Sequence, residues 1–181
     1  MEEKITLKRF PIEEMDYDSV IVMIAKRASG KSWVCRAILR KFRDIPVGII
    51  IAPTERMASP PFYSEFFPDS FIYYKFESRI LEKLFSRQEK MIKKYNNKKK
   101  HGVIINPSAF LLMDDCLSDK GEWSKDPLMY ELMYNGRHYK ILFMLTMQTP
   151  LGIQPDLRSN FDYFFLLATD IENHMKKLYD N

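Results

Sequence analysis

One short stretch of this chain has residue types and a spacing that suit phosphate binding. The sequence Ala25-Lys-Arg-Ala-Ser-Gly-Lys-Ser32 follows the apolar run 20–24 and precedes a segment with helical periodicity. It matches the phosphate-binding loop G-x-x-x-x-G-K-[ST], with alanine at the first glycine position. Such a loop turns backbone N–H groups toward phosphate oxygens, and the following helix adds its positive dipole end. We therefore expect a nucleotide-binding loop, against the alternative of a chance match to a short pattern.

The loop pattern predicts a role for each of its polar positions. Lys31 is expected to reach the β- and γ-phosphates of ATP, and the Ser32 hydroxyl to bind Mg²⁺. Ala25 is tolerable because a methyl group fits wherever φ is negative. The expected nucleotide contacts are the loop and the residue after it: Ala25, Lys26, Arg27, Ala28, Ser29, Gly30, Lys31, Ser32 and Trp33.

Polar residues that close two later apolar runs complete this candidate site. The run 109–113 ends in Asp114 and Asp115. Asp114 is expected to hold the Mg²⁺ shell, and Asp115 to orient or polarise the attacking water. Gln148 follows the run 141–146 and would lie beside the loop if that strand separates the other two. There it could sense the γ-phosphate or position water; the alternative is an ordinary polar residue at a strand end.

These residues need a parallel α/β sheet that brings their strands together. Five apolar runs predict buried strands, at 20–24, 47–52, 109–113, 141–146 and 163–167. A further short strand is a candidate at 71–74. Helices are expected at about 30–42, from Ser78 (as a cap) toward Asn96, around 128–135, at 155–160 and from Asp170. Functional groups at the carboxyl ends of the strands follow the rule for open α/β sheets.

Composition limits the class of protein. The chain has 181 residues, 46% hydrophobic and 29% charged, which are globular values. No apolar run approaches the roughly 20 residues that span a bilayer, and the acidic start does not resemble a signal peptide. We therefore expect a soluble, intracellular protein. Cys35 and Cys116 lack metal-ligand spacing and are interpreted as buried thiols rather than nucleophiles.

Basic and aromatic clusters leave two questions open. Six lysines, Lys90, Lys93, Lys94, Lys98, Lys99 and Lys100, could hold a polyanion. The alternative is a solvated helix that ends in an exposed turn near Asn96. The aromatic residues between 62 and 67 are interpreted as packing rather than base stacking, and apolar residues between Ile5 and Met15 as an arm or edge strand.

The motifs in combination resemble one family. They are 25–32, Leu111-Leu-Met-Asp-Asp-Cys116, Asn135-Gly-Arg-His138, Gln148 and Leu157-Arg-Ser-Asn160. Together they resemble the genome-packaging ATPases of large DNA viruses, the poxvirus and giant-virus type of the FtsK–HerA group of P-loop NTPases. The resemblance implies a RecA-like core sheet of five strands in the order 5-1-4-3-2, numbered along the chain.

The resemblance also implies an activity and partners. It implies an ATPase that drives double-stranded DNA into a capsid as a homo-oligomeric ring, a pentamer or hexamer docked at the portal vertex. The place of action would be a viral factory in the host cytoplasm, or the virion. A catalytic arginine would reach the γ-phosphate of the neighbouring subunit, with Arg137 as first candidate and Arg158 as second.

The chain departs from this family in two respects. FtsK–HerA members commonly carry glutamate after the metal-binding aspartate, whereas this chain has Asp115, one methylene shorter. Members also continue further beyond the fifth strand. We therefore expect a single ATPase domain with an arm (1–18), a core (19–167) and the beginning of a C-terminal segment (168–181), in either a truncated chain or a short member of the family. The alternatives are a P-loop nucleotide kinase and an assembly module that binds nucleotide with little turnover.

Overall fold

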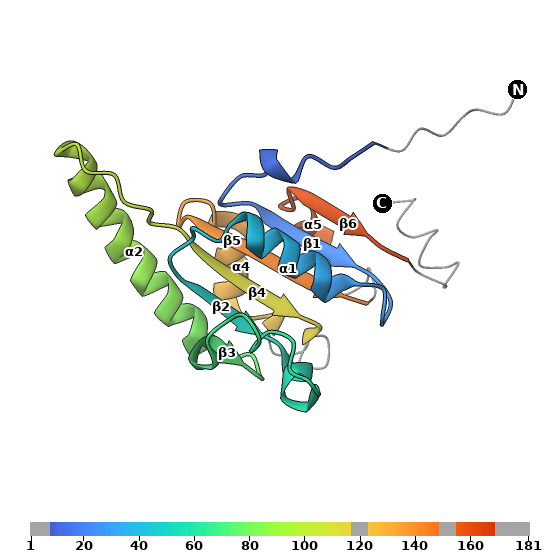
Figure 1. The fold of residues 1–181 in the computed structure, drawn as a ribbon. Coiled ribbons are helices and arrows are strands. Elements are labelled where there is room, and N and C mark those ends of the chain that lie inside the picture. The colour runs from blue at the N-terminus through green and yellow to red at the C-terminus, as the bar shows by residue number, and fades with distance from the viewer. Residues whose placement is uncertain (1–7, 117–122, 149–154, 169–181) are drawn as a thin grey trace, which may run out of the picture.

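A six-stranded parallel sheet forms the centre of the molecule (Figure 1). The computed structural model describes residues 8–116, 123–148 and 155–168. The strands are β1 (Val20–Ile24), β2 (Gly48–Ile51), β3 (Ile72–Tyr73), β4 (Ala109–Asp114), β5 (Ile141–Met147) and β6 (Tyr163–Leu166). Their order is β3-β2-β4-β5-β1-β6. The predicted order of the five core strands is confirmed, and the expected number of five is wrong by one.

The sixth strand is the short candidate near Phe71. Ile72 and Tyr73 pair in parallel with Ile50 and Ile51 of β2, which extends the sheet at that edge. The backbone N–H of Ala52 adds a bond of 2.8 Å to the carbonyl of Tyr73. Two residues give only a weak apolar pattern, so the pairing depends on the exposed edge that β2 offers.

Helices cover both faces of this sheet (Figure 1). They are α1 (Lys31–Lys41), α2 (Ser78–Lys100), α4 (Pro127–Asn135) and α5 (Pro155–Arg158), with short 3₁₀ turns η1 (Ile12–Glu14), η2 (Pro53–Met57) and η3 (Asp69–Phe71). None of the helices in the described ranges combines the length and apolar composition that crossing a bilayer requires.

Two cores lie on opposite faces of the sheet. Val20, Val22 and Ile24 pack into the core shared with α2 and α4, whereas Ile21 and Met23 pack into the core shared with α1. This alternation follows from the two-residue period of a strand. Every residue of β1, β4 and β5 is buried, which explains why these strands are continuous apolar runs in the sequence. Both cysteines are buried free thiols, as expected.

The N-terminal segment packs on the core without forming a strand in its described part, residues 8–18. Met15 is buried under α1, and the Phe10 ring lies edge-on to Tyr163 and Phe165, with centroids 5.9 and 5.1 Å away. The expectation of an arm therefore agrees with the described residues, and that of an edge strand does not. Ile5 and Leu7, the helix expected from Asp170 and most of the expected C-terminal segment lie outside the described residues.

Helix α2 is longer than predicted. It continues through the asparagines and lysines to Lys100, so the turn expected near Asn96 is wrong. The turn comes at Gly102, whose φ is +74°, where the N–H groups of Gly102 and Val103 bond to the carbonyls of Lys99 and Lys98. This is a Schellman motif, the usual stop signal of a helix at glycine. Basic side chains in the last turn also suit the negative end of the helix dipole.

The start of α2 also differs from its prediction. The cap position is Glu77, which makes no side-chain capping bond, and Ser78 is the first helical residue. The Ser78 hydroxyl instead donates to the carboxylate of Asp126, which caps α4. Ser78 thus links two helices rather than capping one.

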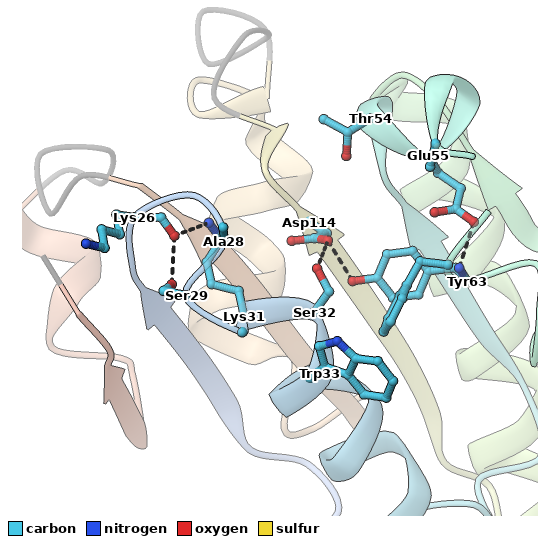
Figure 2. A pocket seen from close by; sticks show the side chains of 13 residues that line it. Lys26, Ala28, Ser29, Lys31, Ser32, Trp33, Thr54, Glu55, Tyr63 and Asp114 are labelled. Carbon is cyan, nitrogen blue, oxygen red and sulfur yellow. Dashed lines mark hydrogen bonds between the residues drawn. The ribbon is translucent and has the colours of Figure 1, made fainter. Parts of the chain in front are cut away.

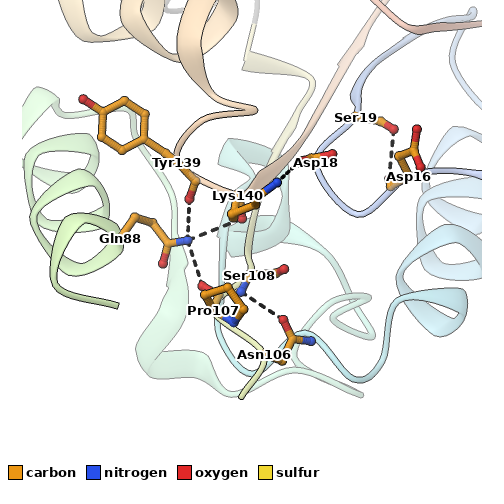
Figure 3. Close-up of polar contacts among 9 residues, drawn as sticks. All are labelled: Asp16, Asp18, Ser19, Gln88, Asn106, Pro107, Ser108, Tyr139 and Lys140. Carbon is orange, nitrogen blue, oxygen red and sulfur yellow. Dashed lines mark hydrogen bonds and ion pairs between the residues drawn. The ribbon is translucent and has the colours of Figure 1, made fainter. Parts of the chain in front are cut away.

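Gln88 fastens the middle of α2 to the sheet (Figure 3). Its side chain is fully buried, and Nε2 donates to the carbonyls of Pro107, Tyr139 and Lys140 at 3.0, 2.7 and 3.3 Å. These carbonyls precede β4 and β5. The contact therefore sets the point from which the rest of α2 projects beyond the sheet (Figure 1).

Replacing Gln88 with methionine is expected to lower the free energy of unfolding by about 2–4 kcal/mol. The side chain keeps its length, but buried carbonyls lose their donor, at about 1–3 kcal/mol each. Urea unfolding followed by circular dichroism measures the loss. The control is Glu89→Met at the neighbouring exposed position, which should change the free energy of unfolding by less than about 0.5 kcal/mol. Equal stability of the two variants would show that Gln88 is not a fastening point.

Candidate functional site

The phosphate-binding loop connects β1 to α1 at the carboxyl edge of the sheet (Figure 2). Gly30 caps α1 with a φ of +91°, and Ala28 also has a positive φ, +56°. Gly30 therefore occupies a conformation that favours glycine. Ala25 is not among the described residues with positive φ, and its N–H donates to the carbonyl of Met147 at 3.0 Å. The alanine at the first glycine position thus fits without strain, as expected.

The Lys31 side chain folds over the loop that carries it. Lys31 is 8% exposed, and its Nζ donates to the backbone carbonyls of Ala25 at 3.1 Å and Lys26 at 3.4 Å. Its positive charge is therefore held inside the curve of the loop. Phosphate oxygens that entered this curve would find the ammonium group and the N-terminus of α1 together.

Three hydroxyl groups converge on the Asp114 carboxylate, and Figure 2 shows two of them, those of Ser32 and Tyr63. Oδ2 accepts bonds from Ser32 Oγ at 3.1 Å and from the Tyr63 hydroxyl at 2.7 Å, and Oδ1 accepts one from Thr146 Oγ1. Asp114 and Thr146 are direct partners in the β4–β5 register. The contact between Ser32 and Asp114 brings together the two expected magnesium ligands.

The donor set around Asp114 suits Mg²⁺. Ser32 and Asp114 offer hard oxygen ligands, which Mg²⁺ prefers, and Mg²⁺ usually takes its remaining ligands from water and phosphate. The described residues include no group of three or more His, Cys, Asp and Glu that could enclose a metal ion. One carboxylate and one hydroxyl beside a phosphate loop fit a metal that takes its remaining ligands from water and a nucleotide.

Asp115 and Gln148 form a pair next to this group. Gln148 Nε2 donates to both carboxylate oxygens of Asp115, at 2.9 and 2.7 Å, and the Asp115 N–H donates to Thr146 Oγ1 at 3.1 Å. Asp115 has a φ of +55°, a conformation that aspartate adopts more readily than most residues. Because β5 lies between β1 and β4, Gln148 reaches the carboxyl edge as predicted.

A pocket of about 440 Å³ opens beside the loop and Asp114. Lys26 and residues 28–33 form one side. The other side comes from the segment 53–67, which follows β2, through Thr54, Glu55, Ala58, Phe62 and Tyr63. Four other predicted site residues, Ala25, Arg27, Asp115 and Gln148, are not among the described lining residues.

Sequence reasoning missed Tyr63, Thr146 and Glu55. Tyr63 was interpreted as packing, and its ring does pack against Phe62 and Phe66, but its hydroxyl also reaches Asp114. Burial and the negative charge of Asp114 raise the pKa of Tyr63 above its ordinary value, so the hydroxyl stays protonated. Thr146 carries the lone hydroxyl of an otherwise apolar strand, a signal that could have identified it.

The two candidate arginines lie away from the pocket. Arg137 follows α4 at the amino edge of the sheet and pairs with Asp162, whose second oxygen accepts the Val20 N–H at 2.8 Å. This pairing raises the pKa of the Arg137 guanidinium. Arg158 ends α5, ahead of β6. Neither is among the described residues that line the pocket.

The six lysines are all exposed on the projecting half of α2. The buried residues of this helix end at Gln88. Beyond that point the helix extends past the sheet, at the end opposite the phosphate loop (Figure 1). The basic patch and the pocket are therefore separate surfaces of one chain.

The sheet order, the phosphate loop and the acidic strand end define a RecA-like P-loop NTPase. The chain belongs to the poxvirus A32 protein family, which matches residues 7–179. The resemblance inferred from the motifs is thereby confirmed at the level of the family.

Similar proteins occur in a mimivirus and an iridescent virus. The uncharacterized protein L437 of Acanthamoeba polyphaga mimivirus is 52% identical over 178 residues, covering 98% of this chain and 62% of that protein. The uncharacterized protein 075L of Invertebrate iridescent virus 6 is 38% identical, covering 90% of this chain and 59% of that protein. The chain thus spans about three fifths of the length of these curated relatives.

Solved structures share the fold. B204, the DNA-packaging ATPase of Sulfolobus turreted icosahedral virus, superposes with a TM-score of 0.63 at 21% identity, over 92% of this chain and 83% of that one. The cytoplasmic domain of EssC gives a TM-score of 0.61 at 16% identity, over 90% of this chain and 35% of that one. At such low identities, these similarities show a shared fold.

Proposed function

We propose that this chain is the ATP-hydrolysing part of a motor that packages viral double-stranded DNA. The observation that carries the proposal is the joining of Lys31, Ser32 and Asp114 at one sheet edge, with the pair Asp115–Gln148 behind them. Structures with the same fold support it, because B204 of Sulfolobus turreted icosahedral virus 2 is a genome-packaging NTPase that binds AMPPCP and ATP-γS.

The proposed reaction is ATP + H₂O → ADP + phosphate. The loop amides and Lys31 would bind the β- and γ-phosphates and stabilise the charge that develops on them. Ser32 and Asp114 would hold Mg²⁺, which neutralises negative charge on the phosphate oxygens when bound.

In the proposed reaction, Asp115 acts on the attacking water. Its carboxylate would orient the attacking water and accept a proton from it as the bond between the γ-phosphorus and the ADP oxygen breaks. Gln148 holds both oxygens of Asp115, so we assign it a positioning role. This assignment replaces the direct contact with the γ-phosphate considered from the sequence.

The ring and its partners belong to the same proposal. Arg137 is the first candidate for the arginine that acts on a neighbouring subunit, because its side chain is 63% exposed at the edge opposite the pocket. Arg158 remains the second candidate. In a ring of five or six copies, the arginine of one subunit would act at the pocket of its neighbour. The capsid vertex, and a viral factory or the virion as the place of action, are proposed on the family resemblance.

Steady-state phosphate release tests the function directly. The purified chain is supplied with ATP and Mg²⁺, with and without duplex DNA, and with and without nucleoside monophosphates as acceptors. Water-dependent release that DNA stimulates is the expected result. Release that needs an acceptor would indicate a nucleotide kinase, although no arginine lines the described part of the pocket. Binding without release would indicate an assembly module.

Specific activity should rise with protein concentration if an arginine acts between subunits.

Neutralising the lysines of α2 is expected to weaken duplex binding at least about tenfold and to flatten its salt dependence. Each lost phosphate contact lowers the slope of log affinity against log salt by about one. The six-fold Lys→Gln variant gives the full effect, measured by fluorescence anisotropy from 50 to 200 mM salt.

A charge-matched pair serves as the control for this prediction. Lys98→Gln with Lys99→Gln is compared with Lys8→Gln and Lys125→Gln, which are exposed on other segments. The α2 pair should lower both affinity and slope more than the control pair does. Equal slopes for the two pairs would assign the lysines to an ordinary solvated surface.

A further inference from the structure

The segment 53–67, between β2 and η3, supplies a buried tyrosine to the candidate magnesium site. Tyr63 is 2% exposed, and its ring packs against Phe62 and Phe66, with centroids 5.2 and 6.0 Å away. Its hydroxyl donates to Asp114 Oδ2 at 2.7 Å, across 51 positions of sequence (Figure 2). Packing thus holds the ring where its hydroxyl meets the Asp114 carboxylate.

Glu55 holds the backbone of Tyr63 in place. Glu55 is 6% exposed, and its Oε1 accepts the N–H groups of Tyr63 at 2.6 Å and Ser64 at 3.1 Å. A buried carboxylate is costly unless hydrogen bonds satisfy it. The bonds to Tyr63 and Ser64 provide that compensation, and they close the segment against the end of β2. The position of the tyrosine thus depends on a second buried group.

Tyr63 contacts the same carboxylate oxygen of Asp114 as Ser32, the other expected magnesium ligand. Asp114 Oδ2 accepts both the Tyr63 hydroxyl and Ser32 Oγ, while Thr146 holds Oδ1. The Asp114 carboxylate is therefore fixed at both oxygens, and its plane is set relative to Ser32. Partners of metal ligands commonly act in this way, and their loss costs about 10–100-fold in metal affinity or activity.

We propose that Tyr63 is a positioning residue for the magnesium site. Its O–H holds the Asp114 carboxylate toward Ser32, and Glu55 holds Tyr63. The inference rests on the proposed function, because it concerns the Mg²⁺ that accompanies ATP. It predicts a specific loss of Mg²⁺ affinity with little change in metal-free nucleotide binding.

Tyr63→Phe separates this role from packing, because the ring is retained and only the hydroxyl is lost. Trp33, 66% exposed at the pocket, provides a fluorescence signal for ADP binding, whereas Trp123 is 1% exposed. ADP affinity is measured in EDTA, and Mg²⁺ is then titrated at fixed ADP. Metal-free affinity should stay within about twofold, while the Mg²⁺ concentration for half-saturation should rise about 10-fold or more. Mn²⁺ binding followed by electron paramagnetic resonance should show the same shift.

Matched variants test the two contacts of the proposal, that of Tyr63 with Asp114 and that of Glu55 with Tyr63. Tyr74→Phe is the control, since Tyr74 is 43% exposed and outside the pocket lining; it should leave all values unchanged. Glu55→Gln keeps an acceptor for the two N–H groups and should stay near wild type in Mg²⁺ affinity. Glu55→Ala should reproduce the Tyr63→Phe defect, with thermal melting used to verify folding.

The outcomes distinguish this inference from the function on which it rests. Mg²⁺ half-saturation of Tyr63→Phe within twofold of wild type, in a protein that binds Mg²⁺–ADP, would overturn the inference alone. An equal loss of affinity in EDTA and in Mg²⁺ would also overturn it, because the tyrosine would then shape the pocket and not the metal site. Wild-type protein that binds no nucleotide would overturn the proposed function itself, and the inference with it.

Discussion

Replacing Lys31 with alanine is expected to lower ATP turnover at least about 100-fold. The ammonium group is buried and held by two carbonyls of the loop, so it occupies a fixed position inside the phosphate-binding curve. Fixed charges in such sites stabilise the transition state, and losing one donor commonly costs about 10²–10³ in rate. Steady-state phosphate release at saturating ATP and duplex DNA measures the effect.

A second lysine in the same loop provides the control for this prediction. Lys26 is exposed, so Lys26→Ala changes the net charge equally but should reduce turnover less than about tenfold. Melting temperatures of both variants should remain within a few degrees of wild type, which separates chemistry from folding. Wild-type turnover in Lys31→Ala would contradict the assignment of the loop as a catalytic phosphate site.

The parts of the fold that sequence predicts well are those with two buried faces. β1, β4 and β5 are covered on both sides, so burial demands apolar residues at every position. The apolar pattern does not specify the two-residue strand β3 or the end of α2. β3 is specified by the edge of β2, and α2 ends where Gly102 permits a positive φ. Both depend on conformation or pairing rather than on periodicity.

The residues of the candidate site also differ in how far the sequence predicts them. Lys31, Ser32 and Asp114 follow from a motif because one local turn and one strand end place them. Tyr63 and Glu55 come from a segment without regular periodicity, and the Tyr63 contact with Asp114 spans 51 positions. No local rule predicts such a contact. The pairing of Gln148 with Asp115 lies between these cases, because strand order predicts its location and the positive φ of Asp115 determines its geometry.

Replacing Asp115 with asparagine is expected to lower kcat about 100-fold while leaving ATP affinity nearly unchanged. Asparagine keeps the size of the side chain but cannot accept a proton, and general-base catalysis typically contributes about 10²–10⁴-fold. Asparagine would also present an amide group to Gln148 Nε2, which now bonds to both oxygens of Asp115. Asp115→Glu restores a carboxylate one methylene longer and should recover most of the activity.

Gln148→Ala should reduce kcat about tenfold, because it only orients the base. The double variant with Asp115→Asn should be no slower than Asp115→Asn alone, since residues that act as a unit are not additive. Additive losses would indicate that Gln148 acts independently on water or phosphate.

Variants at Asp115 and Glu55 show which of the two carboxylates is the general base. Asp115 is not among the described residues that line the pocket, whereas Glu55 is the one other carboxylate besides Asp114 among them. If Asp115 is the base, Glu55→Gln should retain turnover, because the amide oxygen still accepts the N–H groups of Tyr63 and Ser64. Full activity in Asp115→Asn together with a loss of about 100-fold in Glu55→Gln would move the base from the residue after β4 to the turn η2, which follows β2. The departure from glutamate at position 115 would then reflect a water-activating carboxylate supplied by the turn after the neighbouring strand.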